Sequence, residues 1–375
     1  MNDGGGTIVK EALAASQDLS TYDVGETIEG LALKLGKKPS EILKLNSNEN
    51  FFVPVDFLRQ TLKEVVQEVD PRIYPRDETR RLKDALGQYV GVPDEQIVIG
   101  TGSDQLIDLV SRMFMRPGDE ALSIDPTFSI YERCVRIQGG QYRAIPLRED
   151  FSVDAEEMLA SVTPRTRLVF LCSPNNPTAN QFDRGKIQLL AEGFGGLVAV
   201  DEAYVDFSDG SVVELVEKYE NLAVFRTFSK VFGLAGLRVG CAITDPELAK
   251  VINDKFQMPY SVTLVALETA LKILQKTDTI RAAIEDVKAE RQRLIEKLNS
   301  MNGVKAFDSE TNFVLFQVER SSDQVYEELL ERGVIVRNIG RVLHLKNCLR
   351  VTVAPSPMTE RFLDALGEVL AQNAT

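Results

Sequence analysis

Residues 222–245 read LAVFRTFSKVFGLAGLRVGCAITD. Apolar runs at the two ends of this stretch, 222–228 and 238–245, have the length and composition of buried strands. Between them, Lys230 follows Ser229 in apolar surroundings that a surface lysine would not have, and Arg238 comes eight residues later. The stretch therefore predicts two strands of a buried sheet with an unusual lysine between them.

The chain around this stretch alternates strands and helices. Further apolar runs predict strands at 96–100, 120–125, 167–174 and 196–204. Helical patterns occur at 77–91, 103–114, 129–138 and 185–194. This alternation is typical of a parallel sheet covered by helices on both faces, in which ligands bind at the carboxyl ends of the strands. We therefore expect an α/β fold with a mostly parallel, doubly wound sheet.

The pattern changes after about residue 260. A long, highly charged helix is expected at 279–301, and strands are expected at 312–318, 334–339 and 348–354. This α+β pattern predicts a second, smaller domain. The first residues, MNDGGGTIVKEALAASQ, are expected to form a flexible arm, and the segment after them to pack on the small domain. We therefore expect three divisions of the chain. Residues 1–54 form the arm and the segment that packs on the small domain, residues 55–258 form the large domain, and residues 259–375 form the small domain.

The composition disfavours several classes of function. The chain has 375 residues, and its formal net charge of −13 argues against a nucleic-acid-binding surface. Four widely spaced cysteines and a single histidine argue against a disulfide framework, a zinc site or a centre with several histidines, so no metal is expected. Because no apolar run is long enough for a bilayer and the N-terminus lacks a secretory pattern, we expect a cytoplasmic protein without membrane partners.

The segment VIGTGSDQLIDLV at 98–110 predicts a strand, a turn and a helix. Gly100 and Gly102 allow a tight turn, and the backbone amides of Ser103 and Asp104 would face an anion at the helix N-terminus. The alternative is a plain connecting loop in which Ser103 or Asp104 caps the helix. Alone, this segment is a weak indication of a phosphate site.

Two other strand ends carry acid and amide groups. Asp201 ends the strand in LVAVDEAYVDF (197–207), and a buried carboxylate there needs a cation or a hydrogen-bond donor. It is either a capping or salt-bridged acid, or the partner of a protonated ring nitrogen. The asparagines of LCSPNNPTAN (171–180) are either donors in a site or part of a surface turn.

Lys230 and the segments described above can be explained by one cofactor. A lysine in apolar surroundings can have a lowered pKa, and its neutral amine can form a Schiff base with an aldehyde. Thr227, Ser229 and Arg238 are suitable groups around a phosphate. The lysine, the phosphate donors, the acid at a strand end and the glycine turn together predict pyridoxal phosphate as the cofactor.

The chain resembles the fold-type I pyridoxal-phosphate enzymes, specifically the aminotransferase family that contains histidinol-phosphate aminotransferase. The resemblance covers nearly the whole chain, from LSTY at 19–22 to CLRVTV at 348–353. The segments that carry it, in family order, are KLNSNEN, YP, GTGSDQLI, PTFSIY, CSPNNPT, VDEAYVDF, RTFSKVFGLAGLR and SETNFVLF.

The resemblance implies a role for each matching residue around the cofactor. Lys230 would form the Schiff base and shuttle a proton, and Asp201 would pair with the ring nitrogen. Hydrogen bonds to the phenolic oxygen would come from Tyr204 and Asn176, and Phe128, where many relatives have tyrosine, would stack on the ring. The implied phosphate ligands are Gly102, Ser103, Asp104, Thr227, Ser229 and Arg238.

The resemblance also implies the assembly and the substrates. Tyr74 would reach the cofactor of a partner subunit, which makes a homodimer with shared active sites part of the expectation. The implied reaction is transamination of L-histidinol phosphate with 2-oxoglutarate, in histidine biosynthesis. Arg350 would bind an α-carboxylate, and Arg337 and Tyr22 would meet the substrate phosphate, although Arg337 is alternatively an exposed charge at a strand end. Asn48 is a further substrate-binding candidate.

Of two departures from the family pattern, the first lies at the mouth of the small domain and concerns the substrate, and the second lies in a turn near the cofactor. Many relatives have proline and glycine after NEN, where this chain continues FFVP, and the glycine usual after NPT is Ala179. The alternatives are an aromatic-amino-acid aminotransferase and a threonine-phosphate decarboxylase on the same scaffold. A cofactor-binding regulatory module is disfavoured, because the chain keeps the lysine, acid and tyrosine and shows no DNA-binding segment.

Overall fold

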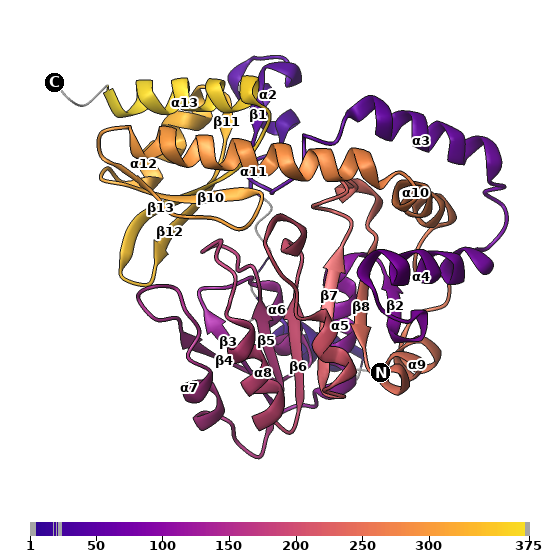
Figure 1. Cartoon of the computed structure of the whole chain (residues 1–375). Helices are drawn as coiled ribbons and strands as arrows, with labels where there is room; N and C mark the ends of the chain where they lie inside the picture. Colours follow the sequence, from indigo (N-terminus) through magenta and orange to yellow (C-terminus); the bar gives the residue numbers. More distant parts are fainter. Residues whose placement is uncertain (1–4, 18, 20, 22–24, 372–375) are drawn as a thin grey trace.

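A seven-stranded sheet forms the centre of the larger part of the molecule (Figure 1). The computed structural model describes residues 5–17, 19, 21 and 25–371. The strands of this sheet, in their spatial order, are β2 (Ile97–Gly100), β8 (Gly240–Thr244), β7 (Leu222–Thr227), β6 (Leu197–Asp201), β5 (Thr166–Cys172), β3 (Glu120–Asp125) and β4 (Gln141–Pro146). Among them, β8 alone runs against its neighbours. The mostly parallel sheet predicted from the sequence is therefore confirmed.

One strand of this sheet, β4, is not predicted from the sequence. It lies at the edge of the sheet, and of its six residues Ile145 alone is buried. Edge strands often carry polar side chains, which prevent their unpaired backbone groups from pairing with another chain. These polar side chains remove the apolar pattern from which a strand is predicted.

Both faces of the sheet are apolar and covered by helices. Alternate strand residues point to opposite faces, so Ile99 and Val169 belong to one apolar cluster and Val98 and Phe170 to the other. The first face is covered by α4 (Asp77–Val90), α7 (Ala155–Ala160), α8 (Arg184–Gly193) and α10 (Leu264–Leu274). The second face is covered by α5 (Gly102–Phe114), α6 (Ile130–Ile137) and α9 (Pro246–Val251). Burial on both faces explains why the strands form continuous apolar runs in the sequence.

A smaller antiparallel sheet lies above the carboxyl ends of the central strands in Figure 1. Its strands, in spatial order, are β12 (Arg337–Val342), β13 (Leu345–Thr352), β10 (Phe313–Val318) and β9 (Val304–Ala306). The helices around it are α11 (Thr277–Asn299), α12 (Ser322–Glu331) and α13 (Ser356–Ala371). The remaining short helical segments of the chain are η1 (Pro39–Glu41), η2 (Asp94–Gln96), η3 (Val205–Phe207), η4 (Val213–Glu217), η5 (Ala235–Leu237) and η6 (Ile252–Phe256).

The N-terminal segment packs on this smaller part. Strand β1 (Leu43–Lys44) pairs in parallel with β11 (Val334–Ile335), and α2 (Ile28–Leu35) buries Leu31 in a cluster with Leu330. A helix not predicted from the sequence, α3 (Val55–Glu68), follows and contacts α10. The domain boundaries expected at residues 54 and 258 remain a prediction.

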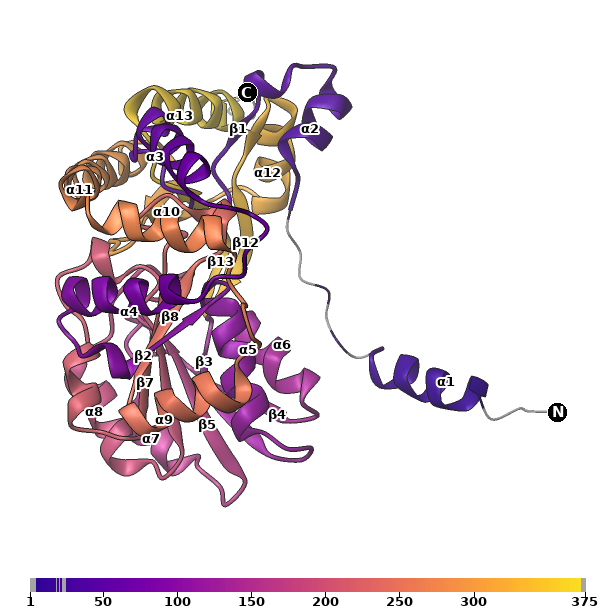
Figure 2. The same ribbon diagram turned by 90° about the vertical axis from the view of Figure 1, so that its right-hand side faces the viewer.

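The expected N-terminal arm contains a helix, α1 (Gly5–Ala15), which Figure 2 shows apart from the rest of the molecule. Its apolar side chains Ile8, Val9 and Leu13 are exposed. Over the part of the chain that the structure describes, no helix has both the length and the apolar character that crossing a membrane requires.

The start of β8 depends on a glycine. A Cβ at Gly240 would come within 2.6 Å of the carbonyl carbon of Gly102 and of the amide nitrogen of Ser103. Backbone atoms cannot rotate away, so we expect Gly240→Ala to lower the free energy of unfolding by about 1–3 kcal/mol, the usual effect of overpacking. Gly236→Ala is the matched control, because a Cβ there meets nothing within 4 Å. Urea unfolding measures both variants, and equal stability of the two would contradict this account.

Candidate active site

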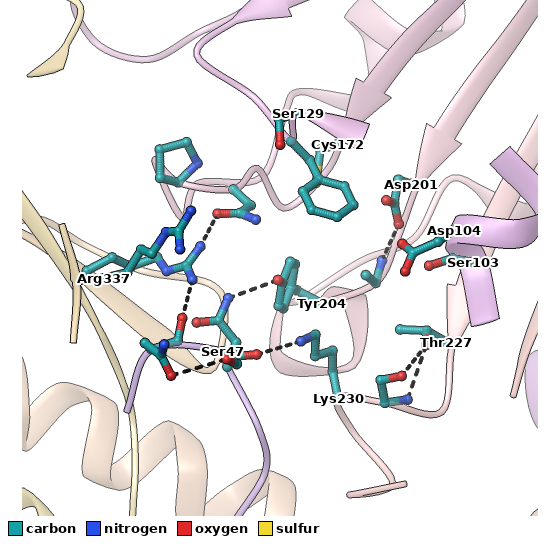
Figure 3. A pocket seen from close by; sticks show the side chains of 18 of the residues that line it. Ser47, Ser103, Asp104, Ser129, Cys172, Asp201, Tyr204, Thr227, Lys230 and Arg337 are labelled. Carbon is teal, nitrogen blue, oxygen red and sulfur yellow. Dashed lines mark hydrogen bonds between the residues drawn. The ribbon is translucent and has the colours of Figure 1, made fainter. Parts of the chain in front are cut away.

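A cavity of about 520 Å³ lies where the central strands end and the small sheet begins (Figure 3). From the central sheet and its loops, the predicted site residues that line it are Ser103, Asp104, Phe128, Asn176, Asp201, Tyr204, Thr227, Ser229, Lys230 and Arg238. From the opposite side come the predicted Asn48, Arg337 and Arg350. Because the carboxyl ends of parallel strands meet at one edge of a sheet, segments far apart in the sequence converge here.

One end of the cavity is a cradle of hydroxyl groups and a guanidinium at the N-terminus of α5. The Thr227 hydroxyl donates to Ser229 Oγ at 3.0 Å, and Arg238 donates to Ser229 Oγ at 3.0 Å and to Asp104 Oδ2 at 3.1 Å. Gly102 lies against this guanidinium with a φ of +77°, and a Cβ there would come within 2.6 Å of Arg238 Nη2. Glycine therefore keeps the cradle open, and the helix N-terminus with the arginine is suited to a phosphate.

Asp201 is buried at the end of β6, with 3% of its surface exposed. The Tyr131 hydroxyl donates to its Oδ2 at 2.8 Å, and the backbone N–H of Ala203 donates to its Oδ1 at 3.1 Å. Burial raises the pKa of Asp201 to about 7, although the Tyr131 hydrogen bond opposes this. Each carboxylate oxygen has a second lone pair, so the group can accept a further hydrogen bond, most favourably from a cationic N–H.

Lys230 reaches the cavity from the loop after β7. Its Nζ donates to the main-chain oxygen of Ser47 at 2.8 Å (Figure 3). Burial, together with a smaller effect of the positive charge of Arg350, lowers the pKa of Lys230 to about 8. A neutral, nucleophilic amine is therefore accessible close to neutral pH.

The phenol of Tyr204 and the amide of Asn176 both line the cavity. Asn48 Nδ2 donates to the Tyr204 hydroxyl oxygen at 2.9 Å, which leaves the phenolic proton available for another acceptor. Asn176 Oδ1 accepts from Arg350, which leaves the Asn176 Nδ2 as a donor. The ring of Phe128 also lines the cavity.

The two arginines of the small sheet face the cavity from neighbouring strands. Arg337 of β12 and Arg350 of β13 are directly paired in the strand register. Arg350 is buried, donates to the main-chain oxygen of Asn46 at 2.7 Å and lies over the ring of Phe313 at 5.1 Å. Two adjacent guanidinium groups can bind two anionic groups, or the two ends of one dianion.

Tyr74, which was predicted to reach the cofactor of a partner subunit, does not line this cavity. Tyr74 is 69% exposed and stacks on Tyr260 with a centroid distance of 4.6 Å. Tyr22 lies outside the described residues.

Sequence reasoning missed two groups that the structure places in the site. The PTFSIY segment contains Tyr131, but Phe128 alone was predicted to act there, because the pattern does not show which way a helical side chain points. The Ser47 contact is made by a main-chain oxygen, which no side-chain pattern signals. The Tyr131 hydroxyl contacts Asp201 and the Ser47 oxygen contacts Lys230, the two residues that the sequence predicts to be chemically active.

The donor set fits pyridoxal phosphate. The cradle suits a phosphate, Asp201 suits a ring nitrogen and Lys230 suits an aldehyde. The glycine at position 102 supports this fit, since any larger side chain would meet the arginine of the cradle. Among the described residues, no group of three or more histidine, cysteine, aspartate or glutamate side chains is placed to hold a metal ion.

Comparisons with known proteins agree with this chemistry. Residues 40–366 match the family model described as aminotransferase class I and II. The chain is 35% identical over 329 residues to the histidinol-phosphate aminotransferase of Caldanaerobacter subterraneus subsp. tengcongensis, covering 88% of this chain and 93% of that protein. It is 38% identical over 351 residues to the histidinol-phosphate aminotransferase of Methanosarcina mazei, covering 93% and 94%.

The solved structures include a relative with a bound cofactor. The histidinol-phosphate aminotransferase from Sinorhizobium meliloti, solved in complex with pyridoxal-5'-phosphate, has a TM-score of 0.85 to this chain at 25% identity. The similarity covers 95% of this chain and 96% of that one.

The lowered pKa of Lys230 predicts its reactivity. In cofactor-free protein, trace acetylation of Lys230 should rise with pH through a midpoint near 8, because the amine becomes neutral above its pKa. Peptide mass spectrometry after labelling at a series of pH values measures this midpoint. A midpoint at the ordinary lysine value of about 10.4 would show that burial does not activate the amine.

Proposed function

We propose a function on the premise that this chain belongs to the aminotransferase class I and II family. The protein transfers the amino group of L-histidinol phosphate to 2-oxoglutarate, giving imidazole-acetol phosphate and glutamate, with pyridoxal phosphate as its cofactor. The observation that carries the proposal is that Lys230, Asp201 and the cradle at Arg238 line one cavity with two paired arginines opposite. The names of the relatives at 35% and 38% identity support the choice of substrate.

Pyridoxal phosphate supplies, when bound, an aldehyde that bonds to amines and a ring that withdraws electrons from the carbon being deprotonated. The residues that would hold its phosphate are Gly102, Ser103, Asp104, Thr227, Ser229 and Arg238. Asp201 would accept a hydrogen bond from the ring nitrogen and provide the negative charge that keeps this nitrogen protonated. Tyr204 and Asn176 would donate to the phenolic oxygen, and Phe128 would cover one face of the ring.

Lys230 Nζ would carry the proton. A group that takes a proton from the substrate carbon and returns it works best with a pKa near the operating pH. Burial brings the pKa of Lys230 to about 8, which meets this requirement. The oxygen of Ser47, which accepts from Nζ at 2.8 Å, gives the amine a defined position.

The paired arginines account for two different substrates in one site. Histidinol phosphate brings a phosphate and no carboxylate, whereas glutamate brings two carboxylates. A guanidinium binds either oxyanion through two parallel hydrogen bonds. We assign the α-carboxylate to Arg350 and the substrate phosphate to Arg337. Asn48 and Tyr22, the latter outside the described residues, complete the proposed substrate site.

The proposal includes a homodimer in the cytoplasm. Tyr74 is exposed together with Ile73, Met258 and Tyr260, and such a group of apolar side chains suits contact with a second subunit. In that arrangement Tyr74 would reach the cofactor phosphate of the partner. All four cysteines are buried and unpaired, which supports a reducing compartment.

A substrate comparison tests the proposal. Purified protein with pyridoxal phosphate and 2-oxoglutarate is supplied with histidinol phosphate, phenylalanine or tyrosine, and glutamate formation is followed. The proposal expects the highest kcat/KM for histidinol phosphate. A higher value for an aromatic amino acid, or release of carbon dioxide from threonine phosphate in place of amino transfer, would contradict it.

The two arginines should affect the two substrates differently. Arg350→Ala should raise the KM of glutamate roughly 10- to 100-fold, the factor for one lost charged hydrogen-bonded pair, with a smaller effect on histidinol phosphate. Arg337→Ala should chiefly raise the KM of histidinol phosphate, with some loss for glutamate.

Steady-state kinetics in both directions of the reaction, with histidinol phosphate varied in one and glutamate in the other, measures both effects. Arg341→Ala is the matched control, because Arg341 lies on β12 with Arg337 but is exposed and does not line the cavity. Equal losses for both substrates in both variants would remove the assignment of the two anion sites.

A further inference from the structure

Tyr131 makes a contact to the acid of the site that the proposed function does not use. Its hydroxyl donates to Asp201 Oδ2 at 2.8 Å. Together with the backbone N–H of Ala203 on Oδ1, this contact gives each carboxylate oxygen one fixed donor. A carboxylate with a donor on each oxygen cannot rotate without breaking a hydrogen bond, so its remaining lone pairs keep a fixed direction.

The position of the Tyr131 ring is itself fixed by packing. The side chain is 1% exposed, and its ring stacks on Phe170 of β5 with a centroid distance of 5.1 Å and an interplanar angle of 2°. The ring also forms a T-shaped pair with Phe128, with a centroid distance of 5.7 Å and an interplanar angle of 88°. Phe128 lines the cavity, so Tyr131 contacts both the acid expected at the ring nitrogen of the cofactor and the aromatic side chain expected on one face of the ring.

The Tyr131 hydroxyl also favours the ionised form of Asp201. The other titratable groups near Asp201 are Cys172 of β5, Asp104 of α5, Lys230 and Tyr204, and burial raises the pKa of Tyr204 so that it stays a neutral phenol. Burial raises the pKa of Cys172, which therefore stays a neutral thiol, and the negative charge of Asp104 makes ionisation of Asp201 harder. The pKa of Tyr131 is raised well above its ordinary value by burial, so the phenol remains a donor. Of these groups, Tyr131 makes the direct hydrogen bond that favours the carboxylate.

We propose that Tyr131 is a positioning residue, which holds the Asp201 carboxylate ionised and directed at the ring nitrogen of the cofactor. This inference rests on the proposed function, because it requires pyridoxal phosphate in the cavity. Tyr131 acts through Asp201 and does not itself touch the substrate.

The test compares two tyrosine-to-phenylalanine variants. Tyr131→Phe removes the hydroxyl and keeps the packed ring. Tyr89→Phe is the matched control, because the Tyr89 hydroxyl also donates to an aspartate, Asp206 Oδ1, at 2.8 Å, and neither residue of that pair lines the cavity. The dissociation constant of pyridoxal phosphate, measured by equilibrium dialysis, and kcat/KM are determined for both variants from pH 6 to pH 9.

At pH 7, Tyr131→Phe should weaken cofactor binding roughly tenfold and lower kcat/KM roughly 10- to 100-fold, as for loss of a hydrogen bond to a charged group. Without the hydroxyl, the pKa of Asp201 rises further, so more of the acid is protonated at neutral pH. Both deficits should therefore shrink as the pH rises to 9 and the carboxylate ionises unaided. Tyr89→Phe should follow the wild-type pH profile.

Two results would overturn the inference. One is a wild-type dissociation constant and pH profile in Tyr131→Phe. The other is a deficit of the same size at every pH, which would show that the hydroxyl does not act through the charge of Asp201. In the Asp201→Asn background, Tyr131→Phe should add less than about a twofold further loss, since no charge is left to stabilise. A wild-type protein that binds no pyridoxal phosphate would overturn the proposed function as well, whereas the two results above leave it intact.

Discussion

The burial of an acid and an amine in the same cavity is the constraint on which the site depends. Away from water the charged forms of both groups are disfavoured, so the pKa of Asp201 rises to about 7 and that of Lys230 falls to about 8. Both groups can therefore change their protonation close to neutral pH. A cofactor with a basic ring nitrogen and an aldehyde uses such a pair, because the nitrogen needs an anion and the aldehyde needs a neutral amine.

The fold places these groups by bringing two sheets together across a short N-terminal segment. The central strands deliver Asp201 and the residues around Lys230 to one edge, and the small sheet presents its arginines opposite. Residues 46–50 join the two parts: Asn48 hydrogen-bonds Thr352 in the small sheet and Tyr204 in the large part, and Asn50 donates to the oxygen of Val231. Groups that bind the substrate and groups that act on the cofactor are thus linked through one segment.

Much of this arrangement could be predicted from the sequence, since its signals are local. Buried strands give continuous apolar runs, and Asp201 and Lys230 stand out as charged residues at the ends of such runs. What the sequence did not indicate depends on three-dimensional direction or on the backbone. Tyr131 looks like any aromatic residue of an amphipathic helix, and the contribution of Ser47 is a carbonyl oxygen. The edge strand β4 lacks an apolar pattern, and the roles expected of Tyr74 and Tyr22 depend on a second subunit and on a segment outside the described residues.

Identification of the lysine that bonds to the cofactor tests the central claim most directly. Protein saturated with pyridoxal phosphate is reduced with borohydride, digested and mapped by mass spectrometry. The account predicts one phosphopyridoxyl group per chain, on Lys230. Modification of a different lysine, or stoichiometric binding with no modified lysine at all, would contradict it.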